Sequence, residues 1–164
     1  MSDHAFITAA PESLFGAIGR HTISWAFVES AIEYMVVASH SWAGGDEIEP
    51  EMPWSLDRKL RFLRKSFDRL PKFKPYATDG LPLLDDIKIA SDIRHDIIHG
   101  VVTNNPDLAL EVKMVRILRS KTERTIKEYR FSTIEILEAA VAANELGRRA
   151  LPLAMRIVGD LSPD

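Results

Sequence analysis

Residues 94–100 read Arg-His-Asp-Ile-Ile-His-Gly, and this stretch ends a long helical pattern. Upstream of it, positions spaced three or four apart share one side of a helix that we predict over about residues 80–98: Leu83, Ile87, Ala90, Arg94 and Ile97. Ionisable side chains are costly beside a core-facing stripe. The cluster therefore marks a candidate functional site.

Downstream of Gly100 the helical period stops and alternation begins. Apolar and polar residues alternate from Leu108 to about Arg116 and again over 125–131, which predicts a β-hairpin over about 108–131. Residues 132–135 form a capping-box pattern that should start the last helix. A ribbon of small residues along this helix lets another helix approach closely: Ala140, Ala143, Gly147, Ala150 and Ala154. Pro152 should kink or divide the helix.

Two more helices precede the central stretch. The first should run from about Pro11 to about Ser39, before the Gly44-Gly45 pair. An acidic, proline-containing loop over 46–51 follows it. Ser55 is a suitable N-cap for the second helix. Its apolar residues recur at alternating spacings of four and three, the clearest amphipathic pattern in the chain: Leu56, Leu60, Leu63, Phe67 and Leu70.

Composition favours one domain spanning residues 1–164, with 46% apolar residues for its core. The net charge of −3 argues against a protein that attracts nucleic acid over its whole surface. The chain contains no cysteine, which excludes disulfides and thiolate metal sites and fits a cytoplasmic protein. We expect neither export nor a membrane span, because no basic and apolar leader and no run of eighteen apolar residues is present.

The central stretch resembles the signature of the HEPN superfamily, in which an arginine, usually followed by a polar residue, precedes a histidine by four to six residues. Here Arg94 and His99 have four residues between them, and His95 follows the arginine. The resemblance implies a mainly α, HEPN-like antiparallel bundle of about four to five helices, with the hairpin inserted before the C-terminal helix. It also implies a homodimer. Many members of the superfamily are metal-independent ribonucleases, and many are not enzymes.

The resemblance assigns roles to four residues. His99 would act as general acid or base, since an imidazole titrates near neutral pH, and Arg94 would hold the scissile phosphate of RNA. His95 and Asp96 would support them; the family more often has asparagine where this chain has His95. No cofactor or metal is implied. A toxin or defence role is implied, with an antitoxin or nucleotidyltransferase as partner; a module that binds RNA, nucleotide or protein without catalysis is the alternative.

Helix geometry restricts how Arg94 and His99 can cooperate. Five residues advance about 140° around a helix and about 7.5 Å along it, so the two side chains of one chain do not converge. Either the last turn unwinds at Gly100, or two protomers form a composite site. A purely structural explanation also exists, in which the two side chains cap helix-end carbonyls and pair with Asp92 or Asp96.

A metal site is a further alternative. Carboxylates and imidazoles on two helices form the pattern of a metal-binding bundle: Glu29, Glu33, Asp92, His95, Asp96 and His99. The fixed charge of Arg94 opposes it. The His-Asp pair is also similar to HD phosphohydrolases, whose remaining ligands would have to be His40 and Asp107. A metal-dependent phosphohydrolase is the least favoured function.

Basic residues are concentrated in two segments. Residues 57–74 hold eight Lys or Arg against two Asp, and residues 113–130 hold seven against two Glu. Such patches can follow an RNA backbone, and they can equally be solvated surfaces. We assign RNA binding to four side chains of the second helix: Arg58, Arg61, Arg64 and Lys65. The three tryptophans are expected to anchor the core and loops rather than to stack on bases.

Overall fold

The computed structural model describes residues 12–104, 110–119 and 124–163, and these form a mainly α protein with one small antiparallel sheet. Its α-helices are α2 (Glu12–Trp42), α3 (Leu56–Arg69), α4 (Ala77–His99) and α5 (Thr133–Leu161). Two short 3₁₀ helices are η1 (Gly45–Glu47) and η2 (Lys74–Tyr76). The strands are β1 (Val101–Asn104), β2 (Leu110–Arg119) and β3 (Arg124–Ser132).

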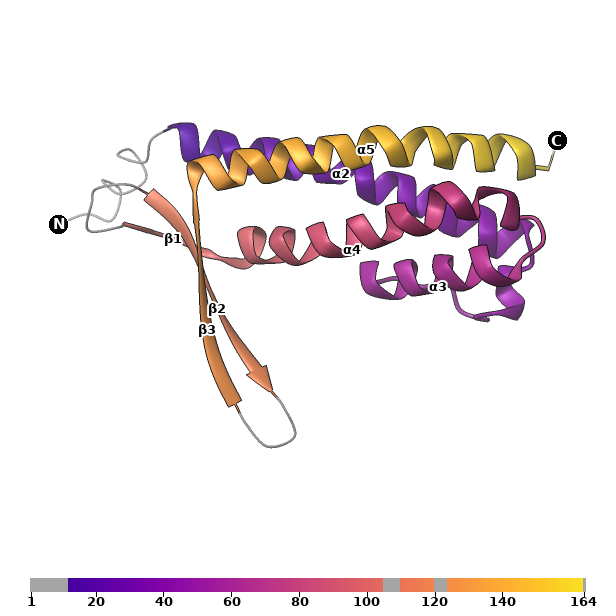
Figure 1. Ribbon diagram of the computed structural model, residues 1–164, viewed down its shortest axis with the longest axis horizontal. Coiled ribbons are helices and arrows are strands. Elements are labelled where there is room, and N and C mark those ends of the chain that lie inside the picture. The colour runs from indigo at the N-terminus through magenta and orange to yellow at the C-terminus, as the bar shows by residue number, and fades with distance from the viewer. Residues whose placement is uncertain (1–11, 105–109, 120–123, 164) are drawn as a thin grey trace.

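Helices α2 and α5 lie side by side, and α4 and α3 follow on one side of this pair (Figure 1). Helix α4 runs opposite to α5, because Arg149 bonds to Asp86 while Arg156, two turns later, bonds to Asp79. Strands β2 and β3 form a ribbon that projects away from the helices (Figure 1). The C-terminal end of α4 lies next to the sheet, because β1 begins two residues after α4 ends.

The expectation of a uniformly antiparallel bundle is wrong for two helix pairs. Helices α2 and α3 run in the same direction, since Glu33 pairs with Lys59 and Ser39 with Ser66. Helices α2 and α5 are also parallel: Arg20 and Ser24 line one groove with Leu137 and Asn144. Phe27, further along α2, lines the next groove with Asn144 and Leu151. For α3 to run in the same direction as α2, the connection over 43–55 must first travel back by about the length of α3, roughly 21 Å. Thirteen residues are long enough for this.

Two hydrophobic clusters hold the helices. The larger cluster joins all four helices around Trp25, Ile32, Phe62, Phe67 and Ile87. The smaller cluster fixes the end of α4 against the first turns of α2 and α5 and against the sheet: Leu14, Ala17, Ile97, Val112 and Ile136. The candidate site therefore lies where α4 packs against α2, α5 and the sheet.

The helix signals in the sequence are confirmed with small shifts. Ser55 caps α3 by accepting from the backbone of Arg58, and Ser132 forms the full capping box with Glu135. The first helix continues beyond Ser39 to Trp42, and Gly44 then adopts a positive φ of 85°. Of the two effects expected at Pro152, a kink or a division, the division does not occur, because α5 is one helix through this residue.

The ribbon of small residues on α5 packs against α2 of the same chain. A Cβ added at Gly147 would lie 3.1 Å from the Cβ of Phe27, so the two helices approach closely at this point. The close approach that the sequence predicts therefore takes place within one chain.

The hairpin is confirmed, and a third strand was not expected. Strand β2 pairs with β3 from Glu111 opposite Ser132 to Arg119 opposite Arg124. Strand β1 begins directly after Gly100 and pairs with β2 through Val101 opposite Lys113. Residues 120–123, between the two alternating segments, and residues 105–109 lie outside the described residues. The sheet therefore starts at the last residue of the candidate site.

The surroundings of Gly100 leave no room for a side chain. Its φ of −75° suits any residue, but an added Cβ would lie 2.4 Å from Val112 and 2.7 Å from the carbonyl oxygen of Asp96. We predict that Gly100→Ala lowers the free energy of unfolding by about 1–3 kcal/mol, because the helix end must move off the sheet. Urea unfolding measures this value.

The matched control is Gly19→Ala in α2. Nothing lies within 4 Å of a Cβ at this position, and the residue is inside a helix. The same substitution should therefore stabilise the protein there, by about 0.5–1 kcal/mol. Equal effects of the two substitutions would contradict the assigned role of Gly100.

Candidate active site at the end of helix α4

Arg94 lies on the core-facing side of α4, as its spacing from Ile87 and Ile97 predicts. Its side chain is 31% exposed, and its Nη2 atom lies 3.0 Å from Oε1 of Glu29 on α2. The same carboxylate oxygen accepts a hydrogen bond of 3.0 Å from Nε1 of the buried Trp25. Helix α2 therefore fixes the position of the Arg94 guanidinium through Glu29, whose carboxylate is held in turn by Trp25.

His95 and His99 lie on another side of α4, and both are exposed. Their ring centroids are 4.6 Å apart with planes tilted by 48°, as i,i+4 side chains on a helix allow. The helix stays regular through His99, so the last turn does not unwind before the motif ends. Within one chain the structure places Arg94 towards α2 and His99 beside His95, and it does not bring Arg94 and His99 together.

Asp96 is buried, with 4% of its surface exposed, and it takes part in a polar interaction inside the chain. The next residue, Ile97, belongs to the smaller hydrophobic cluster. A buried carboxylate in the last turn of a helix cannot contact a substrate directly. Its place in the fold is consistent with the supporting role expected from the sequence.

The sequence did not single out His21, which lies near this site on α2. The side chain is 1% exposed, and neither ring nitrogen makes a hydrogen bond of normal geometry among the described residues. Burial lowers the pKa of His21 below its usual value of 6.5; the backbone of Ala139 opposes this shift, and the charge of Arg94 adds to it. A repeat of four along α2, from His21 through Trp25 to Glu29, was the signal in the sequence.

The lowered pKa of His21 predicts acid sensitivity. The unfolded chain binds a proton at His21 below about pH 6.5 whereas the folded chain resists it, so stability falls as the pH falls through this value. In His21→Leu this part of the pH dependence should vanish. Urea unfolding at pH 7.5 and pH 5.5 measures the change in the free energy of unfolding between these pH values. The control is His95→Gln, which replaces an exposed histidine. An equal change for wild type and His21→Leu would contradict the prediction.

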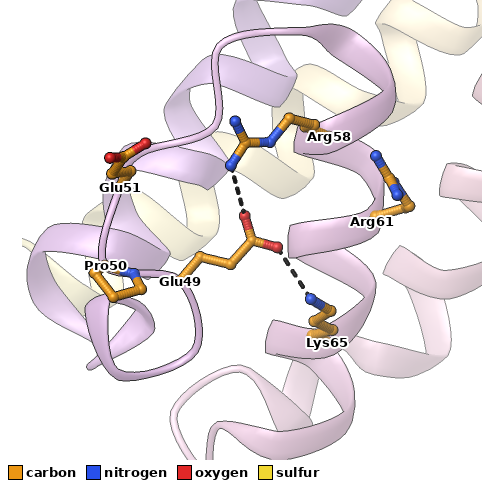
Figure 2. A pocket seen from close by; sticks show the side chains of 6 residues that line it. All are labelled: Glu49, Pro50, Glu51, Arg58, Arg61 and Lys65. Atoms are coloured by element: carbon orange, nitrogen blue, oxygen red, sulfur yellow. Dashed lines mark hydrogen bonds and ion pairs between the residues drawn. The ribbon is translucent and has the colours of Figure 1, made fainter.

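The four side chains assigned to RNA binding all lie on α3, and each has a carboxylate partner. Arg58 and Lys65 flank Glu49, at 3.6 Å and 3.0 Å (Figure 2). Arg61 pairs with Asp57 at 3.2 Å, and Arg64 pairs with Asp85 of α4.

The acidic loop folds onto this basic face of α3. Glu49, Pro50 and Glu51 line a cleft of about 440 Å³ together with Arg58, Arg61 and Lys65 (Figure 2). An RNA phosphate that binds here must compete with these carboxylates. The local charge of the segment therefore overstates the field that it presents to a ligand.

The hairpin shows the same pairing. Lys113 lies 2.7 Å from Glu128, and Arg130 lies 2.6 Å from both Glu111 and Glu128. These contacts lower the pKa of Glu128, first through the hydrogen bond from Lys113. The second basic segment is therefore partly neutralised by its own strands.

The ligands proposed for a metal site do not gather into one. In the described ranges, which lack residues 105–109, no three His, Asp or Glu side chains group in a way that could hold a metal ion. Glu29 is engaged by Arg94, and Glu33 by Lys59. For an HD-type site, His40 bonds to the backbone oxygen of Glu49 at 3.2 Å, and Asp107 lies outside the described residues.

Comparisons with known proteins give no family for this chain. No protein-family model matches it. No curated protein and no solved structure matches it either. Among the helices that the structure describes, none is long and apolar enough to span a bilayer.

Proposed function

We propose that the protein is a HEPN-like, metal-independent endoribonuclease that cuts RNA with the substrate's own 2′-hydroxyl. The observation that carries this proposal is the end of α4. It presents a guanidinium anchored by Glu29 and two solvent-facing imidazoles in contact, all within six residues. An anchored cation suits a phosphate, and an exposed imidazole suits proton transfer at neutral pH.

The chemistry needs a base, an acid and a cation. His99 removes the proton of the 2′-hydroxyl, the freed oxygen attacks the adjacent phosphorus, and the bond to the 5′-oxygen breaks. The proton that His99 has taken then passes to that leaving oxygen, so the products are a 2′,3′-cyclic phosphate and a 5′-hydroxyl. Arg94 offsets the charge on the phosphate oxygens. His95 orients His99 through ring contact, and buried Asp96 supports them from inside the helix end.

The proposed site requires two copies of the chain. Because α4 stays helical through His99, the offset of about 140° between Arg94 and His99 remains within one protomer. Two apolar side chains on the outer side of α4, Ile89 with 68% and Ile93 with 41% exposure, can pack against a second α4. A two-fold dimer through this helix would place Arg94 of one protomer near His99 of its partner. The small-residue ribbon of α5 plays no part, since α2 covers it.

We further propose that the enzyme acts in the cytoplasm as a toxin or in defence, with an antitoxin or a nucleotidyltransferase as partner. This step rests on the resemblance of residues 94–100 to the HEPN signature. Expression in a host cell tests it: wild type should arrest growth and His99→Ala should not. Equal growth with both proteins would contradict a toxin role.

The second candidate is a HEPN-like module that binds RNA, nucleotide or a partner protein without catalysis. The Arg94–Glu29 pair favours this second candidate, because the guanidinium that would bind a phosphate is already paired with a carboxylate. Cleavage of single-stranded RNA by the purified protein in the presence of a chelator separates the two candidates.

If RNA crosses α3, reversing Arg61, Arg64 and Lys65 to Glu should weaken binding and flatten its dependence on salt. Each neutralised phosphate contact contributes about one unit to the slope of log K against log salt concentration, so the slope should fall by up to about three. Filter binding at several salt concentrations measures it.

The matched control reverses three arginines of α5, Arg148, Arg149 and Arg156, which gives the same change in net charge. Two of them are also paired with carboxylates, as on α3. Equal loss of binding in both triple variants would show that only the overall charge matters, and the α3 surface would then have no specific role.

A further inference from the structure

A cleft beside Arg94 has the groups that recognise a nucleobase. Its volume is about 380 Å³, and its polar and aromatic lining comes from Glu29, Ser30, Glu33, Trp54 and Lys59. Glu29 is the carboxylate that holds Arg94. The cleft and the proposed phosphate-binding cation therefore share one side chain.

Trp54 is exposed where the sequence suggested an anchor. Its side chain is 78% exposed, the largest value among the exposed large apolar side chains of the described residues. Its neighbours hold the backbone on both sides, since Pro53 is buried and Ser55 caps α3. A solvent-facing indole on a fixed backbone is a flat surface on which a base can stack, and its side chain has only two rotatable bonds to order.

The carboxylates of the cleft retain acceptor capacity. Both bonds to Glu29, from Trp25 and from Arg94, use Oε1, and the bond from Lys59 to Glu33 uses Oε2. Oε2 of Glu29 and Oε1 of Glu33 take part in none of these bonds. Carboxylate oxygens accept hydrogen bonds from amino groups, as in contacts to the N4 amine of cytosine.

We propose that this cleft binds one base of the RNA substrate, which stacks on Trp54 and donates an amino group to Glu29 or Glu33. Adenine, cytosine and guanine carry such a group, whereas uracil has none, and its one ring donor, N3–H, lies between two carbonyl oxygens that a carboxylate repels. The enzyme therefore prefers a base with an exocyclic amine next to the cleaved phosphate. This inference rests on the proposed function, because Arg94 places the phosphate beside the cleft.

The test uses the full chain carrying His99→Ala, so that RNA is not consumed. Short homopolymers of adenylate, cytidylate and uridylate are titrated while tryptophan emission is followed. Adenylate and cytidylate oligomers should bind more tightly than uridylate and should quench the emission. Trp54→Ala should weaken their binding by about 5- to 150-fold, the equivalent of about 1–3 kcal/mol for one base–aromatic stack.

Trp54→Phe should retain most of the affinity, and Glu33→Gln should narrow the preference against uridylate because an amide can also donate. Val141→Ala is the matched control, since it removes a similarly exposed apolar side chain from a different groove. AMP and UMP alone test whether the base suffices without the RNA chain; the same preference with the monomers supports the cleft.

Binding of RNA that Trp54→Ala leaves unchanged would overturn this proposal. Failure of every oligomer to bind would overturn it as well, whereas cleavage by wild type decides the proposed function separately. A shift of Trp54 emission that follows protein concentration and not RNA would identify the cleft as a protein interface, and it would also overturn the proposal.

Discussion

His99→Ala and Arg94→Ala should each reduce cleavage of single-stranded RNA by about 10²- to 10⁴-fold, with a chelator present throughout. The first variant removes the proposed proton-transfer group, and the second removes the cation proposed to offset charge on the phosphate. The wild-type products should end in 2′,3′-cyclic phosphate, because the attacking oxygen belongs to the substrate. Gel analysis of labelled RNA and mass spectrometry of the products measure both results.

Thermal stability separates a catalytic from a structural effect. His99 is exposed, so His99→Ala should leave the melting temperature nearly unchanged. The Arg94–Glu29 pair is partly exposed, and its loss should cost at most about 1 kcal/mol. Lys88→Ala is the matched control, because it removes a half-exposed cation from the same helix, and it should leave cleavage intact.

Three results would point elsewhere. Activity that disappears on chelation would contradict a metal-independent reaction. A large loss of stability in Arg94→Ala would make the ion pair with Glu29 structural. A folded protein that cuts none of several RNAs would favour the binding module.

Sequence periodicity predicted the helices where one side of the helix is clearly apolar. The spacing of Leu60, Leu63 and Phe67 indicated α3, and Ser55 and Ser132 marked two helix starts, because side-chain caps are local signals. Helix direction is not local, and the parallel α2 and α3 depend on how the loop over 43–55 returns. Strand β1 has only four residues, too few for alternation to indicate it.

For the candidate site, the sequence predicted on which side of α4 each residue lies, but not which residues of other helices it contacts. The pattern put Arg94 on the core side of α4, and this is confirmed by its contact with α2. That the contact would be Glu29, far away in the chain, depends on the packing of two helices and has no sequence signal. The exposure of Trp54 was missed for a related reason: hydrophobicity predicts burial on average and not for a single residue.

An equal mixture of Arg94→Ala and His99→Ala proteins should recover about a quarter of wild-type activity, although each protein alone is inactive. In the proposed two-fold dimer, one site combines Arg94 of one protomer with His99 of its partner. Half of the randomly formed dimers carry one copy of each variant, and in each of these dimers one of the two sites has both intact side chains. The assay is RNA cleavage after the two proteins have been unfolded and refolded together.

The control mixture pairs Arg94→Ala with the double variant Arg94→Ala/His99→Ala, in which no arrangement of protomers creates a complete site. It should stay inactive, and this excludes recovery through contamination or refolding. Failure of the first mixture to recover, with dimers confirmed by light scattering, would place both side chains in one protomer. Because α4 is helical through His99, that result would require the last turn of the helix to open when RNA binds.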